Sequence, residues 1–129
     1  GEKMELKFYY CSHCKKIAVE LKNSANVPSI CCGEKMTEMV AGSVDAAKEK
    51  HVPEVKVHGN QVDVVVGSVE HPMLPEHLIE FIVLETKHGH QVKFLKAGDA
   101  PKASFSVVDD EPVAVYEYCT LHGLWKTAL

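Results

Sequence analysis

Valines alternate with polar residues on both sides of a tight turn in the segment Val55-Lys56-Val57-His58-Gly59-Asn60-Gln61-Val62-Asp63-Val64. A period of two is typical of strands that bury one face. His58-Gly59-Asn60 has the chemistry of a hairpin turn. The segment therefore predicts an antiparallel β-hairpin.

The same pattern recurs downstream of this hairpin. Residues 78–85 and 92–95 are apolar runs on either side of the turn residues 87–90, which predicts a second hairpin. Two further strands are expected over residues 103–107 and 113–118. The only helix-prone stretch is residues 43–50, with Ser43 as its expected N-cap. Short strands with almost no helix predict an all-β fold, a β-sandwich.

The N-terminal part of the chain has a different character. Four of the five cysteines lie within the first 32 residues. Ala41-Gly42-Ser43 is the expected boundary, which gives domains of residues 1–39 and 40–129. A unit of about 40 residues buries too little apolar surface to be stable alone, so it needs a metal or disulfide staple.

Composition excludes several classes of partner. The chain has 129 residues and a net charge of −4 with neutral histidines. Because no run of lysine or arginine is present, we expect no binding to nucleic acid or to anionic membranes. No apolar run is long enough to span a bilayer. Residues 1–6 lack the apolar core of a signal peptide, so a cytoplasmic location is expected.

The N-terminal cysteines form the first candidate metal site. Cys11 and Cys14 form a CxxC knuckle, and Cys31 and Cys32 are adjacent. Four thiolates suit tetrahedral zinc or a single iron. For both vicinal cysteines to reach one metal, the backbone must bend, and Gly33 would help this bend. The alternatives are a purely structural zinc knot and two disulfides, the latter disfavoured because nothing indicates export.

The second candidate site draws on residues spread over the expected sandwich. His51, His71 and His77 lie in proline-rich loops, and Cys119 and His122 form a CxxH knuckle. Structural zinc prefers four ligands that are mostly sulfur. Four nitrogens and one sulfur suit a five-coordinate iron with a vacant sixth position. Such an ion would be a site for chemistry on a small molecule.

Taken in order, these segments resemble desulfoferrodoxin, the two-iron class of superoxide reductase. The resemblance covers essentially the whole chain, including Glu49-Lys50-His51-Val52-Pro53, His71-Pro72-Met73 and the C-terminal Gly123 and Trp125. It implies a desulforedoxin- or rubredoxin-like domain with an Fe(Cys)4 centre. It also implies an immunoglobulin-like β-sandwich with an Fe(His)4(Cys) centre, four equatorial imidazoles and an axial thiolate.

The resemblance further implies an activity: superoxide is reduced by one electron and two protons to hydrogen peroxide. Lys50 would attract the superoxide anion, and Glu49 would occupy the sixth position of the oxidised iron. The backbone amides of Leu121 and His122 are expected to donate to the Cys119 sulfur. Electrons would come from rubredoxin or a similar donor, and the protein would be a homodimer.

Three other interpretations of the same residues remain open. The chain could be an electron-transfer protein with two iron centres and no turnover. It could be a zinc-stabilised binding module, with zinc in place of iron at the four cysteines. A thiol–disulfide oxidoreductase using Cys11 and Cys14 is disfavoured because no βαβ pattern is present.

Overall fold

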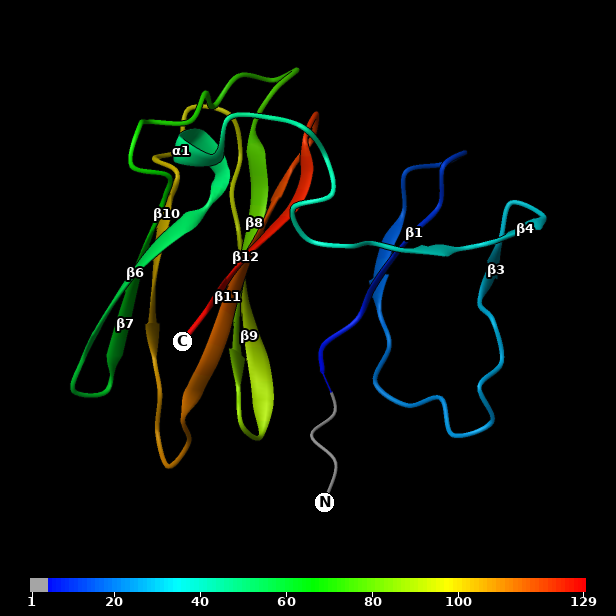
Figure 1. Cartoon of the computed structure of the whole chain (residues 1–129), viewed down its shortest axis with the longest axis horizontal. Helices are drawn as coiled ribbons and strands as arrows, with labels where there is room; N and C mark the ends of the chain where they lie inside the picture. The colour runs from blue at the N-terminus through cyan, green and yellow to red at the C-terminus, as the bar shows by residue number, and fades with distance from the viewer. Residues whose placement is uncertain (1–4) are drawn as a thin grey trace. The chain divides into compact units, whose positions relative to one another are not determined.

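The computed structural model describes residues 5–129. Gly1–Met4, which belong to the segment used for the expectation about export, lie outside the described residues. The chain separates into two compact units, Gly1–Val40 and Ala41–Leu129 (Figure 1). The protein is nearly all-β, as expected, with a small cysteine-rich unit followed by a β-sandwich.

The first unit is built from very short strands. Its three-stranded sheet has the order β2-β1-β5, and β3 pairs with β4 in a separate hairpin. The strands are β1 (Phe8–Tyr10), β2 (Ile17–Val19), β3 (Ile30–Cys31), β4 (Glu34–Lys35) and β5 (Thr37–Glu38). Among residues 5–40 only Phe8 and Cys11 are buried. This core is too small to hold the unit together by apolar burial alone.

The second unit consists of two antiparallel sheets of three and four strands, ordered β10-β7-β6 and β12-β11-β8-β9. Its elements are α1 (Lys48–His51), β6 (Pro53–His58), β7 (Gln61–Val66), β8 (Ile79–Thr86), β9 (Gly89–Phe94), β10 (Lys102–Ser106), β11 (Pro112–Cys119) and β12 (Gly123–Ala128). The immunoglobulin-like sandwich is thus confirmed. In the four-stranded sheet, the edge strand β9 pairs with β8, because a two-residue turn joins these strands into a hairpin.

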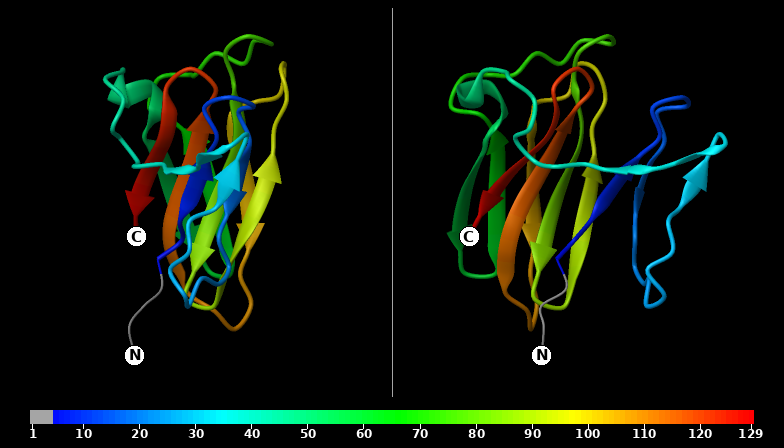
Figure 2. Two further views of the ribbon diagram at one scale, coloured as in Figure 1. Left: turned by 90° about the vertical axis from the view of Figure 1, so that its right-hand side faces the viewer. Right: turned by 45° about the vertical axis from the view of Figure 1, so that its right-hand side comes forward.

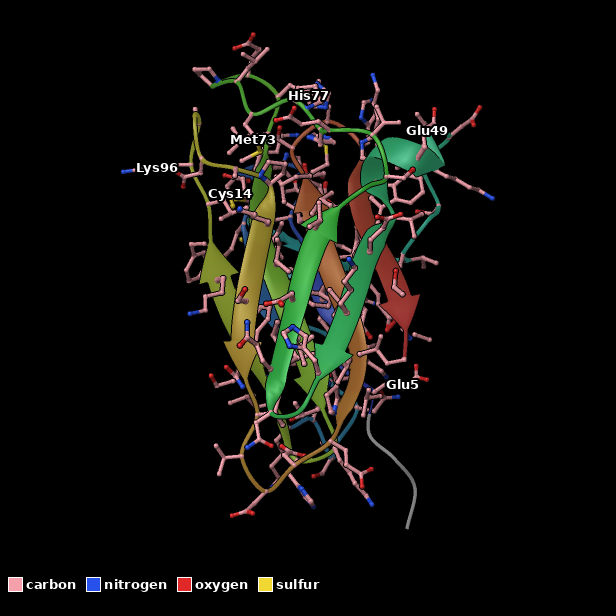
Figure 3. The ribbon with its side chains drawn as sticks, turned by 90° about the vertical axis from the view of Figure 1, so that its left-hand side faces the viewer. Glu5, Cys14, Glu49, Met73, His77 and Lys96 are labelled. Carbon is pink, nitrogen blue, oxygen red and sulfur yellow. The ribbon has the colours of Figure 1, made fainter. Side chains whose placement is uncertain are left out.

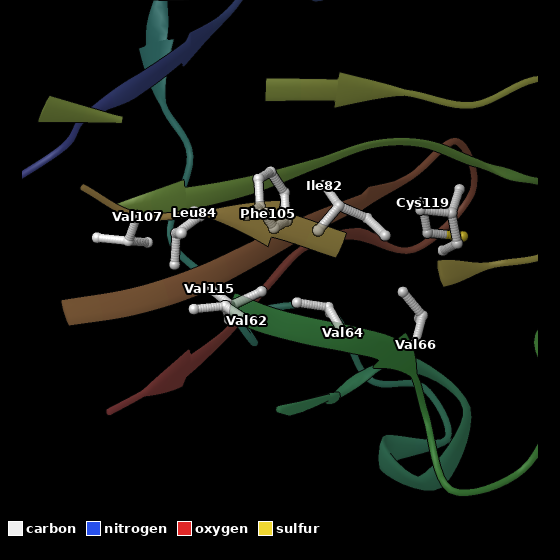
Figure 4. Close-up of a cluster of buried hydrophobic side chains, with 10 residues drawn as sticks. Val62, Val64, Val66, Ile82, Leu84, Phe105, Val107, Val115 and Cys119 are labelled. Carbon is white, nitrogen blue, oxygen red and sulfur yellow. The ribbon is translucent and has the colours of Figure 1, made fainter. Parts of the chain in front are cut away.

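The core of the second unit lies between the two sheets (Figure 4). Alternate residues of β7, together with Phe105 of the neighbouring strand β10, face residues of β8 and β11 in the other sheet, as the period of two requires. The buried cluster comprises Val62, Val64, Val66, Ile79, Ile82, Leu84, Phe105, Val107, Val115 and Cys119. Cys119 is part of this cluster, so the core ends directly at a residue of the second candidate site.

One local expectation was wrong, and one strand was not anticipated. The helix is only the four residues Lys48–His51, and its N-cap position is Ala47, not Ser43; no side chain caps it. The strand β12 was not expected, because no period of two is visible in Gly123–Ala128. It forms since every one of its residues pairs with β11, an already buried strand.

The short helix and several loops lie together at one end of the sandwich. Figures 1 and 2 show α1 at this end, together with the loop that follows β7 and the turn that joins β11 to β12. Among residues 5–129, no helical segment has the length and apolar character that crossing a bilayer requires.

Candidate metal centres

The four N-terminal cysteines converge on one point. The sulfur atoms of Cys11, Cys14, Cys31 and Cys32 all lie within 4.8 Å of one another. The Cys14 and Cys31 sulfurs are 3.6 Å apart, and the Cys31 and Cys32 sulfurs are 4.0 Å apart. Sulfurs at tetrahedral positions about 2.3 Å from a metal would be about 3.8 Å apart. The cluster therefore fits one tetrahedral ion.

The backbone bends at the vicinal pair, as its position requires. Cys32 has φ 52° and Gly33 has φ 78°, both in the left-handed region. Glycine adopts this conformation freely, whereas the cysteine is strained by it. The bend closes the β3–β4 hairpin and turns both sulfurs to the same side.

The state of the thiols supports a cation at this site. The backbone N–H of Cys14 holds the pKa of the Cys11 thiol at about 6, below its usual value. The Cys31 thiol donates to the sulfurs of Cys14 and Cys11, and these hydrogen bonds raise its pKa to about 12. The pKa of Cys32 is raised as well, so positive charge beside Cys31 and Cys32 is needed for both to become thiolates at neutral pH. All five cysteines are free, so the disulfide alternative is not supported.

The second site is a ring of four imidazoles. The centroid distances are 4.7 Å for His51–His71, 4.8 Å for His71–His77, 5.1 Å for His77–His122 and 4.8 Å for His122–His51. Each ring lies nearly perpendicular to its neighbours, at 76° to 85°. Residues from four separate parts of the second unit thus form a nearly square arrangement.

The nitrogens of this ring are spaced for a metal. Nε2 of His51 lies 3.2 Å from Nε2 of His71 and 3.1 Å from Nδ1 of His122. Donors at right angles on one ion, each about 2.1 Å from it, would be about 3.0 Å apart. Nε2 of His77 is buried and has no hydrogen-bond partner among the described residues. An orphaned nitrogen in this position fits a metal ligand.

The opposite nitrogens of two of these rings set the tautomers. Nδ1 of His51 donates to the Ala47 carbonyl at 2.6 Å, and Nδ1 of His71 donates to the Pro72 carbonyl at 2.7 Å. These bonds leave Nε2 of each ring with a free lone pair. Burial lowers the pKa of His51 and His77, and lowers that of His71 to about 4. Burial therefore favours the neutral form of these three imidazoles, which is the form that binds a metal.

The Cys119 sulfur lies beside the ring, 3.3 Å from Nε2 of His71 and 3.8 Å from Nδ1 of His122. Burial raises the pKa of this thiol, while the backbone N–H groups of Leu121 and His122 lower it. These are the two backbone amides that the sequence analysis expected to act on this sulfur. The ligand atoms of His51, His77, Cys119 and His122 all lie within 4.8 Å of one another, and His71 contacts two of these residues.

Exposure differs across the site. His51, His71 and Cys119 are buried, whereas His77 and His122 are half-exposed. Solvent therefore reaches the ring from the side of His77 and His122. Both donor sets, one of four sulfurs and one of four nitrogens with a sulfur, have the chemistry of mononuclear iron centres.

Glu49 and Lys50 lie on α1, next to His51 in the chain. Glu49 is exposed and Lys50 is half-buried. Figure 3 shows Glu49 and His77 at the same end of the sandwich. The positive charge of Lys50 adds to the lowering of the pKa of His51 and His77 that burial causes. The Glu49 carboxylate is not among the clustered ligand atoms of the described residues.

Two further residues lie near the ligands in space or in sequence without belonging to the ligand set. The Trp125 ring stacks on His51 at 5.0 Å and 24°, and its indole N–H donates to the His122 carbonyl at 3.0 Å. Glu117, two residues before Cys119, is fully buried, and both its oxygens lack a partner among the described residues. Trp125 belonged to the motif noted in the sequence, whereas no sequence signal pointed to Glu117.

Comparison with known proteins agrees with this geometry. The family model described as Desulfoferrodoxin matches residues 43–128. The desulfoferrodoxin of Nitratidesulfovibrio vulgaris is 47% identical over 122 residues, which cover 95% of each chain. The crystal structure of the superoxide reductase from Treponema pallidum superposes with a TM-score of 0.80 and 41% identity, covering 96% of this chain and 99% of that one.

A shorter structural relative matches only part of the chain. The superoxide reductase of Giardia intestinalis, described as 1Fe-SOR, superposes with a TM-score of 0.56 and 37% identity. The match covers 64% of this chain and 98% of that one. The first unit, Gly1–Val40, is less than a third of the chain, so the match must extend over much of the second unit. By its sequence, its fold and its two clusters of ligand residues, the chain belongs to the desulfoferrodoxin family.

Proposed function

We propose that this protein is a superoxide reductase. It reduces superoxide with one electron and two protons to hydrogen peroxide, and the site of this reaction is the ring of His51, His71, His77 and His122 with Cys119. The observation that carries the proposal is the square of imidazoles with a sulfur beside it and solvent access at one edge. When bound there, iron supplies the electron.

The side chains around the ring prepare it for a small anion. Four imidazole ligands and one thiolate would leave a bound divalent ion with net positive charge, which would attract superoxide. The buried side, with His51, His71 and Cys119, keeps water away from the sulfur. Protons reach the substrate from water at the open edge, where His77 and His122 are half-exposed.

Product analysis tests this function directly. The iron-loaded, reduced protein is mixed with a known amount of superoxide, and peroxide and dioxygen are measured. One peroxide for each superoxide consumed, without release of dioxygen, supports the reductase. If the protein can be oxidised and reduced but superoxide decays at its spontaneous rate, the chain is a two-centre iron electron-transfer protein.

Lys50 is proposed as the residue that attracts superoxide. The proposal is supported by its adjacency to His51 and by its effect on the pKa of His51 and His77. We expect Lys50→Ala to slow the second-order reaction with superoxide about tenfold and to flatten its dependence on salt. The matched control is Lys48→Ala, which removes an exposed charge from the same short helix. Equal rates for both variants in pulse-radiolysis kinetics would exclude this role.

Glu49 is proposed as the sixth ligand of the oxidised iron. A carboxylate prefers the harder ferric ion, and Glu49 is exposed on α1, close in sequence to His51. We expect Glu49→Ala to shift the visible absorption of the ferric protein while changing the rate of superoxide capture less than twofold. The control is Glu54→Ala, an exposed glutamate at the start of β6. A ferric spectrum like that of the parent would contradict this ligation.

For the first centre, we propose that residues 1–39 form the desulforedoxin-like domain and residues 40–129 the catalytic one. The ligands of the first centre are Cys11, Cys14, Cys31 and Cys32. Iron is the proposed occupant, and zinc is the competitor because its tetrahedral thiolate chemistry is the same. Metal analysis with visible spectra of both oxidation states distinguishes them, since four-thiolate ferric iron absorbs in the visible range and zinc does not.

Rubredoxin or a similar small iron protein is the proposed electron donor. The proposal is supported by the reaction itself, which consumes one electron for each superoxide and needs an external source. The test is whether reduced rubredoxin restores the ferrous spectrum of the oxidised protein within the time of turnover. Failure with rubredoxin and success with a flavoprotein would identify another class of donor.

A homodimer and a cytoplasmic location complete the proposal. Val92 and Phe94 are exposed on β9, an edge strand, and such apolar edges favour pairing with another chain. Light scattering of the purified protein measures the oligomeric state.

The proposed cytoplasmic location is supported by the cysteines. All five are free, and free thiols persist in reducing compartments. Fractionation of the cells tests this location.

A further inference from the structure

The chain makes an unusually close backbone contact just after β7. Gly67 has φ +78°, and a Cβ atom built on it would lie 2.5 Å from the Glu49 carbonyl oxygen. The same atom would lie 2.7 Å from the carbonyl carbon of Lys50 and 2.8 Å from its Cα. All three neighbours are backbone atoms of α1, so no side chain can rotate away to make room.

Residues 67–69, here named the strap, hold α1 by hydrogen bonds on both sides of this contact. The Val69 N–H donates to the Glu49 carbonyl at 2.9 Å, and the Gly67 N–H donates to the Val52 carbonyl at 3.1 Å. The Ser68 hydroxyl lies 3.4 Å from the same Glu49 oxygen. Figure 4 shows the end of β7, at Val66, next to the α1 turn.

The short helix needs this support. α1 has four residues and no side-chain cap, and a helix of one turn is not stable by itself in water. The segment nevertheless carries three residues of the proposed site, Glu49, Lys50 and His51. Their positions therefore depend on what packs against the α1 backbone.

We propose that Gly67 is a positioning residue for the superoxide site. By having no side chain, it lets the strap lie directly against α1 and so sets where Lys50 and His51 stand. This inference rests on the proposed function of the site. A methyl group at residue 67 displaces the α1 backbone, which moves the Lys50 charge and the His51 ligand together.

Other glycines allow this effect to be separated from backbone strain. Gly59, at the turn between β6 and β7, has φ +61°, and a Cβ atom there would have nothing within 4 Å. An alanine at either position must adopt an unfavourable left-handed conformation. Only the alanine at residue 67 also collides with another segment of backbone.

The experiment compares Gly67→Ala with Gly59→Ala in the full-length, iron-loaded protein. We expect both variants to lower the midpoint of thermal unfolding by a few degrees, roughly what strain at one residue produces. We expect only Gly67→Ala to shift the ferric absorption spectrum and to slow the second-order reaction with superoxide about tenfold or more, because displaced groups lose their alignment.

A second variant covers the case in which Gly67→Ala does not fold. Val69→Pro removes the N–H that donates to the Glu49 carbonyl but leaves residue 67 as glycine. It should shift the ferric spectrum in the same direction. If Gly67→Ala matches Gly59→Ala in spectrum and rate, Gly67 has no positioning role. If Gly67→Ala does not fold and a folded Val69→Pro has the spectrum of the parent, the proposal is likewise overturned. Failure of the parent protein itself to form peroxide would instead overturn the proposed function.

Discussion

The two units of this protein differ in what stabilises their folds. The four-cysteine unit has strands of two or three residues and only two buried side chains among residues 5–40. The sandwich has strands of up to eight residues and a continuous core between its sheets. In the first unit, a metal has to stabilise the fold. In the second, a fold that is stable by packing can hold histidines in an arrangement that suits an ion.

Among the changes that test this difference, loss of one thiolate should have the largest effect on stability. We expect Cys31→Ser to remove the first metal and unfold residues 5–40, because structural metal sites contribute about 10 kcal/mol or more to folding. Iron analysis should fall from two ions to one for each chain, and limited proteolysis should cut only within the first unit. Ser12→Ala, in the same CxxC knuckle, is the control. If the first unit resisted the protease without its metal, the metal would not be what stabilises this unit.

A cavity in the sandwich core should have a smaller effect, confined to the other unit. Ile82 is fully buried in β8, and Ile82→Ala should lower the free energy of unfolding of the sandwich by about 3 kcal/mol. The visible spectrum of the four-cysteine centre should not change. Val65→Ala, on the outer face of β7 where the side chain is 47% exposed, should change stability by less than about 1 kcal/mol. Equal losses for both variants would contradict a core-stabilised unit.

The smallest predicted effect concerns Glu117, the buried carboxyl next to the second site. Burial raises its pKa to about 9. Because the folded protein keeps this proton and the unfolded chain releases it above about pH 4.5, stability falls as pH rises between these two values. Glu117→Gln should remove this dependence. Relative to the parent, the variant should gain roughly 2 kcal/mol between pH 5 and pH 7.

Thermal unfolding of both proteins across this pH range is the measurement. Glu54→Gln, an exposed glutamate on β6, should leave the pH profile of the parent unchanged. Parallel profiles for the parent and Glu117→Gln would mean that the Glu117 carboxyl is not held neutral in the folded protein.

The ligand sets illustrate how far sequence reasoning reached. Cys11, Cys14, Cys31 and Cys32 could be grouped from spacing alone, because a CxxC knuckle and an adjacent pair have few other uses. The grouping of His51 with His71 depended on resemblance to a family, since a lone histidine carries little information about its neighbours. The expected helix cap at Ser43 was wrong because α1 is held from outside, by residues 67–69.

Residues that act through long-range contacts were not predictable. Nothing local distinguishes Gly67 from Gly59. Gly59 lies in the turn between β6 and β7, Gly67 directly follows β7, and both strands are rich in valine. Their difference is the α1 backbone, which packs against Gly67. Similarly, Glu117 occurs in a strand pattern that fits an edge as well as a core, and its burial depends on the strands that flank β11.

The amino-acid sequence by itself determined the all-β class and the four-cysteine ligand set, because alternation and short spacings are local properties of the chain. Only the tertiary structure decided that four imidazoles form a square, that β12 exists and that the strap holds α1. These features depend on distances between segments far apart in the chain, and packing of the whole sandwich sets those distances.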